Sequence, residues 1–169
     1  IDMELIDTFL KSMEMDLDKT KYSQSGYEEY ILGSAEVVGL MCLKIFVEGD
    51  EKKYMELKPD AMKLGSAFQK INFLRDLKAD VHLLGRSYFP GFDAKNFNRQ
   101  TKKEIEADIQ KDFDAGLRGI RQLPRKARLG VYLAYIYYIS LFKKIQNTSP
   151  ELVMDTRIRI SDPKKYMLF

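Results

Sequence analysis

The stretch from residue 61 to residue 83 constrains the fold most, because it combines a helical repeat of apolar residues with one polar face. The small and apolar residues that recur at helical spacing are Ala61, Leu64, Gly65, Ala67, Phe68, Ile71, Phe73 and Leu74. At about 100° per residue, a helix places Gln69, Asn72, Asp76 and Asp80 within a sector of roughly 80°. A helix this apolar is expected to be largely buried, so these four side chains should line a cavity.

The four polar side chains allow two interpretations. Aspartate and asparagine four residues apart are common on solvent-facing helix surfaces, and the spacing taken alone favours that explanation. Two carboxylates one helical turn apart, with amides beside them, also suit Mg²⁺ or Mn²⁺, hard cations that take oxygen ligands and are commonly completed by substrate phosphates and water. Because the surrounding segment is apolar, the sequence favours a metal-diphosphate site.

Helical spacing continues along the rest of the chain, and no alternating strand pattern is convincing. Helices are expected over about 2–17, 27–47, 60–83, 101–121 and 124–146, with a loop over 85–98. Pro59 is placed for the first turn of the third helix, and Thr101 with Glu104 forms a capping box for the fourth. We therefore predict an all-α fold, with residues 1–169 in a single domain.

Composition excludes several classes of protein and site. The chain has 169 residues, is 45% hydrophobic and carries a formal net charge of only +3 with 25 acidic residues, which argues against a nucleic-acid partner. Its one cysteine, Cys42, sits among apolar neighbours and is expected to be a buried thiol, so no disulfide framework forms. His82 is the only histidine, which excludes a histidine-based metal site or catalytic triad. We expect it on the surface near a helix end.

An aromatic run near residue 135 also has two interpretations. Residues 129–142 are apolar nearly all round the helix and include Tyr132, Tyr135, Tyr137, Tyr138 and Phe142. A run of about 14 residues is shorter than the roughly 20 that a bilayer requires. It fits a central core helix, and its ring faces could also stabilise a carbocation without offering a nucleophile.

Residues 65–90 resemble the second aspartate-rich signature of the squalene and phytoene synthase family, the head-to-head prenyl synthases. That signature has a Gly-x-Ala-Phe-Gln start, an Asn-x-x-Arg-Asp-x-x-x-Asp core and a Gly-Arg-x-Tyr-x-Pro close, and all three elements occur here. Residues 12–17, 30–41 and 157–165 are similar to other family segments, in the same order. The close and the basic ending look most like those of bacterial phytoene synthases.

The chain departs from the family at one point. Family members carry an earlier Asp-x-x-x-Asp signature upstream of the segment that begins at Ser12, and this sequence has no such pair. The sequence also opens at Ile1 within an expected helix, without a capping residue. We interpret the chain as the C-terminal portion of an isoprenoid-synthase-type helical bundle, with the N-terminal helices missing from this chain. The fragment alone is therefore expected to be inactive.

The resemblance implies a prenyltransferase that joins two isoprenyl diphosphates through a cyclopropyl diphosphate intermediate. Asp76 and Asp80, assisted by Asn72, would hold Mg²⁺ and promote departure of the diphosphate. Tyr30 matches the family's active-site tyrosine, and Arg75 would act beside the acids. The implied substrate-binding residues are Gln69, Asn72, Arg86, Tyr88 and Arg159, and Arg157 could take the place of Arg159.

Several choices within this interpretation stay open. Geranylgeranyl diphosphate giving phytoene, in carotenoid biosynthesis, is preferred; a squalene or dehydrosqualene synthase using farnesyl diphosphate is the alternative, and NADPH would be needed only for squalene. Rivals of other kinds are a non-catalytic helical assembly subunit and a head-to-tail synthase or terpene cyclase. The expected location is cytoplasmic, with peripheral membrane contact through Lys164, Lys165 and Tyr166. The oligomeric state cannot be predicted from the sequence.

Overall fold

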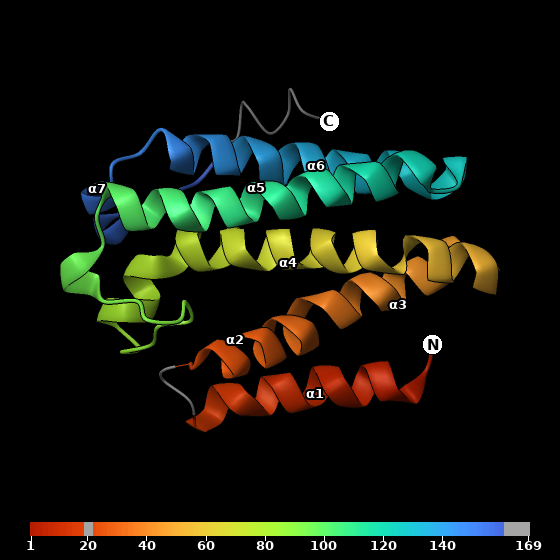
Figure 1. Cartoon of the computed structure of the whole chain (residues 1–169), viewed down its shortest axis with the longest axis horizontal. Coiled ribbons are helices and arrows are strands. Elements are labelled where there is room, and N and C mark those ends of the chain that lie inside the picture. Colours follow the sequence, from red (N-terminus) through yellow and green to blue (C-terminus); the bar gives the residue numbers. More distant parts are fainter. Residues whose placement is uncertain (19–21, 161–169) are drawn as a thin grey trace.

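Helices form the whole framework of the chain, as a computed structural model that describes residues 1–18 and 22–160 shows (Figure 1). The elements are α1 (Met3–Asp18), α2 (Gln24–Ile31), the π-helix η1 (Leu32–Glu36), α3 (Val37–Phe46), α4 (Glu51–His82), the 3-10 helix η2 (Ala94–Asn96), α5 (Arg99–Gln122), α6 (Arg125–Gln146) and α7 (Pro150–Asp155). No β-strand occurs in the described ranges. The predicted all-α fold is confirmed.

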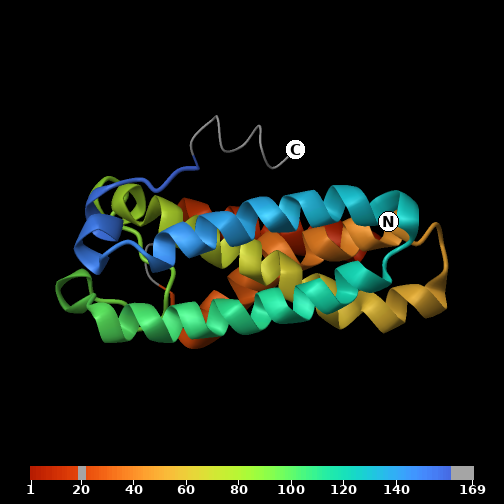
Figure 2. The same cartoon turned by 90° about the horizontal axis from the view of Figure 1, so that it is seen from above.

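The long helices lie roughly along one axis, and successive ones run in opposite directions (Figure 1). α4 occupies the middle of the stack and contacts α3, α5, α6 and α7. Seen from above, α6 crosses over α4 beside α5 (Figure 2). This arrangement lets α4 carry the polar face and also form one wall of the apolar cavity described below.

The predicted bounds hold for the first and last long helices but are wrong for the third. That helix begins at Glu51, about nine residues earlier than expected, because Asp50 caps it by accepting a hydrogen bond from the Lys53 amide at 2.9 Å. Pro59 therefore lies inside α4, at an exposed position, and not in its first turn. The second predicted helix is present from Gln24 but contains the π-helical turn η1, and α7 was not predicted.

The capping box of α5 uses a different pair from the predicted one. The Asn98 side chain accepts hydrogen bonds from the Gln100 and Thr101 amides, and the Thr101 hydroxyl accepts one from the Asn98 amide. Thr101 is thus the second member of the box, and Glu104 instead accepts a hydrogen bond from Gln100.

The core lies mainly between α4, α5 and α6. Its fully buried side chains include Ile71, Leu74, Ile109, Phe113, Leu141 and Phe142. The predicted core role of α6 is confirmed on that face, whereas Leu129 and Tyr132 on its outer face are exposed. Within the part of the chain that the structure describes, no helix has both the length and the apolar composition to cross a membrane.

A glycine brings α4 unusually close to the preceding helix. A Cβ atom added at Gly65 would lie 2.5 Å from the carbonyl oxygen of Ala35, in η1. Real Cβ atoms do not approach a backbone oxygen this closely, so only glycine permits the contact. Gly65, which opens the Gly-x-Ala-Phe-Gln element, therefore sets the distance between α4 and the η1–α3 segment.

Candidate functional site

The carboxylates of the polar face lie near the C-terminal end of α4, where Asp76 is already paired with two arginines. Its carboxylate accepts hydrogen bonds from Arg75, including one from Nε at 3.1 Å. Arg157 Nε lies 2.7 Å from Asp76 Oδ1 and approaches from the segment after α7. Two positive side chains therefore surround one of the two candidate metal ligands.

Asp80 experiences a different environment, one turn along the same face. Burial, and next the negative charge of Asp76, raise its pKa to about 6, while Arg86 opposes the shift. The two carboxylates are thus close enough to repel each other, and that repulsion is what a divalent cation between or beside them would relieve.

A second polar cluster, which we call the Asp16 cluster, consists of Asp16, Tyr30, Arg86 and Tyr88. Tyr30 OH donates to Asp16 Oδ2 at 2.8 Å, and Tyr88 OH donates to Asp16 Oδ1 at 3.2 Å. Arg86 lies 3.4 Å from Oδ1 and donates to the Asp16 backbone oxygen at 2.7 Å. Asp16 was not predicted as a site residue, although its segment was noted for its resemblance to the family.

Glycine geometry joins the Asp16 cluster to the acids of α4. Gly85 has a φ of +59°, a left-handed conformation that glycine adopts at low cost and that reverses the chain after α4. The Arg86 amide then donates to the Asp80 carbonyl oxygen at 2.7 Å. This turn explains why the Gly-Arg-x-Tyr element places Arg86 and Tyr88 beside the carboxylates.

The amide residues of the polar face meet an aromatic side chain from α6. Asn72 donates to Gln69 Oε1 at 3.4 Å, and Tyr138 OH donates to Asn72 Oδ1 at 3.3 Å. The Tyr138 ring also stacks on Phe68, with ring centroids 4.0 Å apart. Tyr138 therefore brings one ring of α6 next to the polar face of α4, and a role for the ring faces beside a carbocation stays a prediction.

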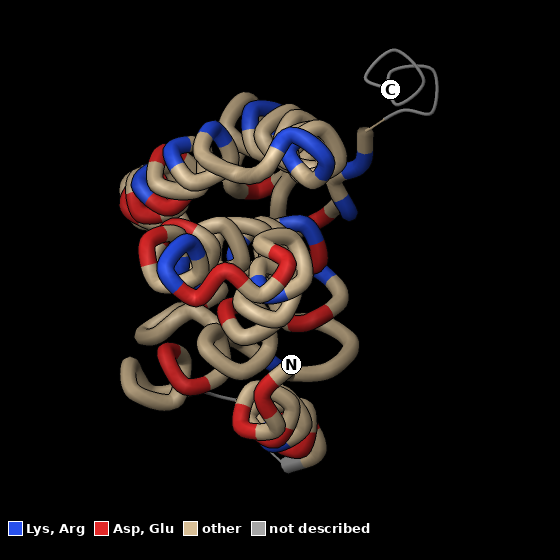
Figure 3. The backbone as a smooth tube through the Cα atoms, turned by 90° about the vertical axis from the view of Figure 1, so that its right-hand side faces the viewer, with Lys and Arg blue, Asp and Glu red and all other residues tan. Residues whose placement is uncertain are grey.

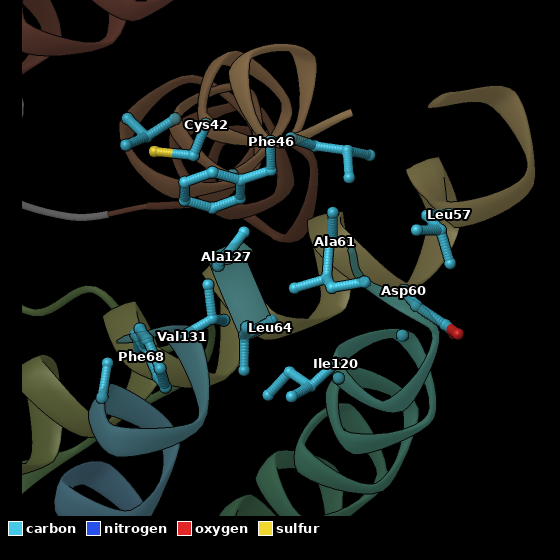
Figure 4. A pocket seen from close by; sticks show the side chains of 18 of the residues that line it. Cys42, Phe46, Leu57, Asp60, Ala61, Leu64, Phe68, Ile120, Ala127 and Val131 are labelled. Carbon is cyan, nitrogen blue, oxygen red and sulfur yellow. The ribbon is translucent and has the colours of Figure 1, made fainter. Parts of the chain in front are cut away.

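An apolar cavity of about 610 Å³ begins where the polar face ends. Gln69 is part of its lining, and the walls come from α3, α4, α5 and α6 through Phe46, Ala61, Leu64, Phe68, Ile120 and Val131 (Figure 4). Cys42 also lines it and is exposed, so the prediction of a buried thiol is wrong. Its apolar neighbour Leu43 lines the same cavity and is buried, whereas the Cys42 side chain is exposed there (Figure 4).

The Mg²⁺ site predicted from the sequence can be compared with the donor side chains present. Among residues 1–18 and 22–160, no three Asp, Glu, His or Cys side chains converge as an all-protein metal cage would need. Mg²⁺ commonly binds through one or two carboxylates and takes its other ligands from phosphate and water. The neighbouring carboxylates of Asp76 and Asp80 fit that second kind of site.

The remaining predicted residues are placed as follows. Arg159 is exposed, and its backbone oxygen accepts a hydrogen bond from Lys144 at 2.6 Å, whereas Arg157, the alternative considered from sequence, reaches Asp76. His82 is exposed at the end of α4, as predicted. Lys164, Lys165 and Tyr166 lie outside the described residues. The catalytic and metal-binding roles of the site residues stay predictions.

Sequence comparison gives the arrangement its context. The sequence model of the squalene/phytoene synthase family matches residues 1–164. The chain belongs to the squalene/phytoene synthase family. This match confirms the family resemblance over nearly the whole length of the chain.

Comparison with individual members of the squalene/phytoene synthase family shows what share of their length this chain covers. It is 27% identical to a 15-cis-phytoene synthase from Synechocystis sp., over 99% of this chain and 56% of the relative. It is also 27% identical to a 15-cis-phytoene synthase from Pantoea ananas, over 94% of this chain and 55% of the relative. The chain thus spans about half the length of these curated relatives.

A solved structure supports the fold. The squalene synthase HpnC from Alicyclobacillus acidocaldarius superposes with a TM-score of 0.75 at 21% identity, over 87% of this chain and 60% of that one. At this identity the likeness concerns the fold alone. The predicted isoprenoid-synthase-type architecture is confirmed.

The raised pKa of Asp80 predicts a pH-dependent stability in this family member. The folded state holds the Asp80 proton more tightly than the unfolded chain, so ionised Asp80 lowers stability, and this cost develops between about pH 4 and about pH 6. Without metal, Asp80→Asn should raise the urea midpoint at about pH 8 and change it little at about pH 4. Asp7→Asn, an exposed change on α1, should have no effect at either pH. Equal effects of Asp80→Asn at both pH values would contradict the prediction.

The hydrogen bond between Tyr30 and Asp16 should be measurable as a coupling energy. Hydrogen bonds to charged groups contribute about 1.5–3 kcal/mol, so a double-mutant cycle of Tyr30→Phe and Asp16→Asn in urea denaturation should give a coupling of about 1–2 kcal/mol. Tyr54→Phe supplies the control, because Tyr54 belongs to the other core cluster and should show no coupling to Asp16→Asn. Additive effects in the first cycle would show that the negative charge of Asp16 does not strengthen this hydrogen bond.

Proposed function

We propose that the full-length protein is a prenyltransferase that condenses two isoprenyl diphosphates head to head through a cyclopropyl diphosphate intermediate. One observation carries the proposal: a single stripe of α4 changes from the cavity wall at Ala61 and Gly65, through Gln69, to the carboxylates of Asp76 and Asp80. That stripe matches an amphiphile with a hydrocarbon tail and a diphosphate head. Membership of the squalene/phytoene synthase family supports the same reaction.

The site residues have defined roles in this proposal. Asp76 and Asp80, with Asn72, would hold Mg²⁺, which when bound neutralises diphosphate charge and makes it a better leaving group. Arg157 now pairs with Asp76 and would be free to bind diphosphate oxygens when a cation replaces it there. Arg86, the member of the Asp16 cluster that lies beside Asp80, would also bind diphosphate oxygens. Arg159 is retained as a weaker candidate for this role.

Aromatic residues would protect the cationic stage of the reaction. Burial and the hydrogen bond to Asp16 raise the pKa of Tyr30, which keeps it a neutral phenol whose hydroxyl donates a hydrogen bond to the Asp16 carboxylate. The centroid of the Tyr30 ring lies 5.1 Å from that of Tyr88 and 5.9 Å from that of Phe73, so three aromatic rings pack together beside Asp16. Ring faces stabilise a carbocation through their quadrupoles.

We propose geranylgeranyl diphosphate as the substrate and phytoene as the product, because both curated relatives are phytoene synthases. The test is incubation of the full-length protein with Mg²⁺ and labelled geranylgeranyl or farnesyl diphosphate, followed by hydrocarbon analysis. A forty-carbon product supports the proposal. A thirty-carbon product would instead indicate a squalene or dehydrosqualene synthase, and adding NADPH would distinguish these two activities. The absence of a product from either substrate would favour a non-catalytic assembly subunit.

A further inference from the structure

The corner where α5 ends and α6 begins holds a second cavity, of about 460 Å³, with a basic and apolar lining. The lining residues are Leu117, Ile120, Arg121, Arg125, Arg128, Leu129 and Tyr132, and no Asp or Glu is among them. Ile120 also lines the apolar cavity of the candidate site, so the two cavities share a wall. The corner lies at the opposite end of the bundle from the C-terminal turns of α4 (Figure 1).

The positive charge of this corner is not compensated within the described residues. Neighbouring basic residues have acidic partners there, since Arg118 pairs with Asp60 at 3.2 Å. No carboxylate in residues 1–18 and 22–160 lies within ion-pair distance of Arg121, Arg125 or Arg128. Figure 3, which views the molecule from this end, shows many of the Lys and Arg residues on the upper helices, α5 and α6.

The direction of α6 increases the positive potential. Its first turn contains Arg125, Lys126 and Arg128 and no acidic residue, and its N-cap Pro124 supplies no side-chain hydrogen bond. Cations at the positive end of a helix dipole are unfavourable unless an anion lies nearby. Lys126 has such a partner in Glu48, 3.5 Å away, whereas Arg125 has no ion-pair partner in residues 1–18 and 22–160. Arg128 is partly committed, because it donates to the Leu123 carbonyl oxygen at 2.7 Å, while Arg121 and Arg125 remain exposed.

Exposed apolar side chains stand one helical turn after two of these arginines. Leu129 follows Arg125 by four residues and is 66% exposed, and Tyr132 follows Arg128 by four residues and is 42% exposed. A soluble phosphate would neutralise the arginines but leave both apolar side chains in water. A phospholipid bilayer would cover both kinds of group, because basic side chains reach the headgroups while apolar ones enter the interface.

We propose that the α5–α6 corner docks on an anionic phospholipid bilayer. Arg121, Arg125 and Arg128 bind headgroup phosphates, and Leu129 and Tyr132 insert at the boundary with the acyl chains. Charge complementarity and the exposed apolar pair carry this proposal, which does not depend on the prenyl chemistry. If that chemistry also holds, docking places the shared wall of the two cavities next to the lipid.

The test is co-sedimentation of the full-length protein with phosphatidylcholine vesicles, with and without phosphatidylglycerol. Each basic residue near an anionic surface contributes about 1 kcal/mol, so Arg121→Gln/Arg125→Gln should weaken binding to the anionic vesicles about thirtyfold. The matched control is Lys95→Gln/Lys103→Gln, the same charge change on exposed lysines at the other end of the bundle, which should retain wild-type binding. Circular dichroism melts verify that each variant is folded.

A third variant separates a bilayer from a soluble anion. Leu129→Gln/Tyr132→Gln keeps every charge and should also weaken vesicle binding at least fivefold, and inorganic diphosphate should not displace the wild-type protein. The proposal is overturned if anionic vesicles do not bind, or if the arginine and lysine pairs lose binding equally. It is also overturned if Leu129→Gln/Tyr132→Gln leaves vesicle binding unchanged and inorganic diphosphate displaces the protein from the vesicles, because the ligand is then a soluble phosphate.

Discussion

Replacing Asp76 with asparagine in the full-length protein is expected to lower kcat/KM for hydrocarbon formation about a thousandfold. Metal-ion charge stabilisation contributes several kcal/mol to a transition state, and each 1.36 kcal/mol is a factor of ten in rate. Asparagine keeps the shape of the side chain and one oxygen, but it loses the charge that holds the cation. The loss should appear in a hydrocarbon assay across a range of Mg²⁺ concentrations.

Stability should change little in the same variant. Asp76 pairs with Arg157, whose side chain is 51% exposed, and with Arg75, whose side chain is 23% exposed, and the amide oxygen of asparagine can still accept a hydrogen bond from either arginine. Asp114→Asn is the control, because this exposed acid on α5 lies outside the site and should leave kcat/KM unchanged. If Asp76→Asn is fully active and binds Mg²⁺ like the wild type, the proposed metal site is wrong.

Replacing Gly65 with alanine should lower the free energy of unfolding by about 2–3 kcal/mol, a large loss for a change of one methyl group. The new Cβ would meet the Ala35 carbonyl oxygen at 2.5 Å and the Ala35 carbonyl carbon at 2.9 Å. Both are backbone atoms, so no rotamer change can remove the overlap, and α4 must move away from η1. The measurement is urea denaturation followed by circular dichroism.

A second glycine in the same cavity supplies the control for this prediction. Gly130, in α6, lines the cavity but has no heavy atom within 4 Å of the position of an added Cβ. Gly130→Ala should therefore raise stability by up to about 1 kcal/mol, through helix propensity alone. Stabilisation by both substitutions would mean that the close contact at Gly65 does not hold α4 in place.

The local pattern of the chain was enough to predict the presence of the long helices, though not α7, and the polar face of α4. Asn72, Asp76 and Asp80 share that face because helical periodicity alone brings them together. The Asp16 cluster could not be predicted in the same way, because Asp16 and Tyr88 are 72 residues apart and meet only when α1 packs beside the turn after α4. Tertiary packing also decides that Cys42 faces the cavity, although its sequence neighbours are apolar.

Competing local signals explain the errors in helix bounds. Pro59 is a strong mark of a helix start, but Asp50 offers a side-chain cap earlier, and α4 tolerates the proline at an exposed interior position. Thr101 was assigned the first place of a capping box, whereas Asn98 holds that place and Thr101 is its partner. In each case two residues of the right type compete, and spacing does not decide between them.

The acids and the cavity wall lie on one helix but on different turns, so the space for a hydrocarbon tail and the position of the carboxylates can vary independently. Successive residues of a helix advance about 1.5 Å, so the fifteen steps from Ala61 to Asp76 cover about 22 Å of rigid backbone. A larger or smaller side chain at Ala61 or Leu64 would change the room for a tail without moving Asp76 or Asp80. Under the proposed function, the early turns of α4 would set the length of the substrate tail and the later turns would set the chemistry at its diphosphate.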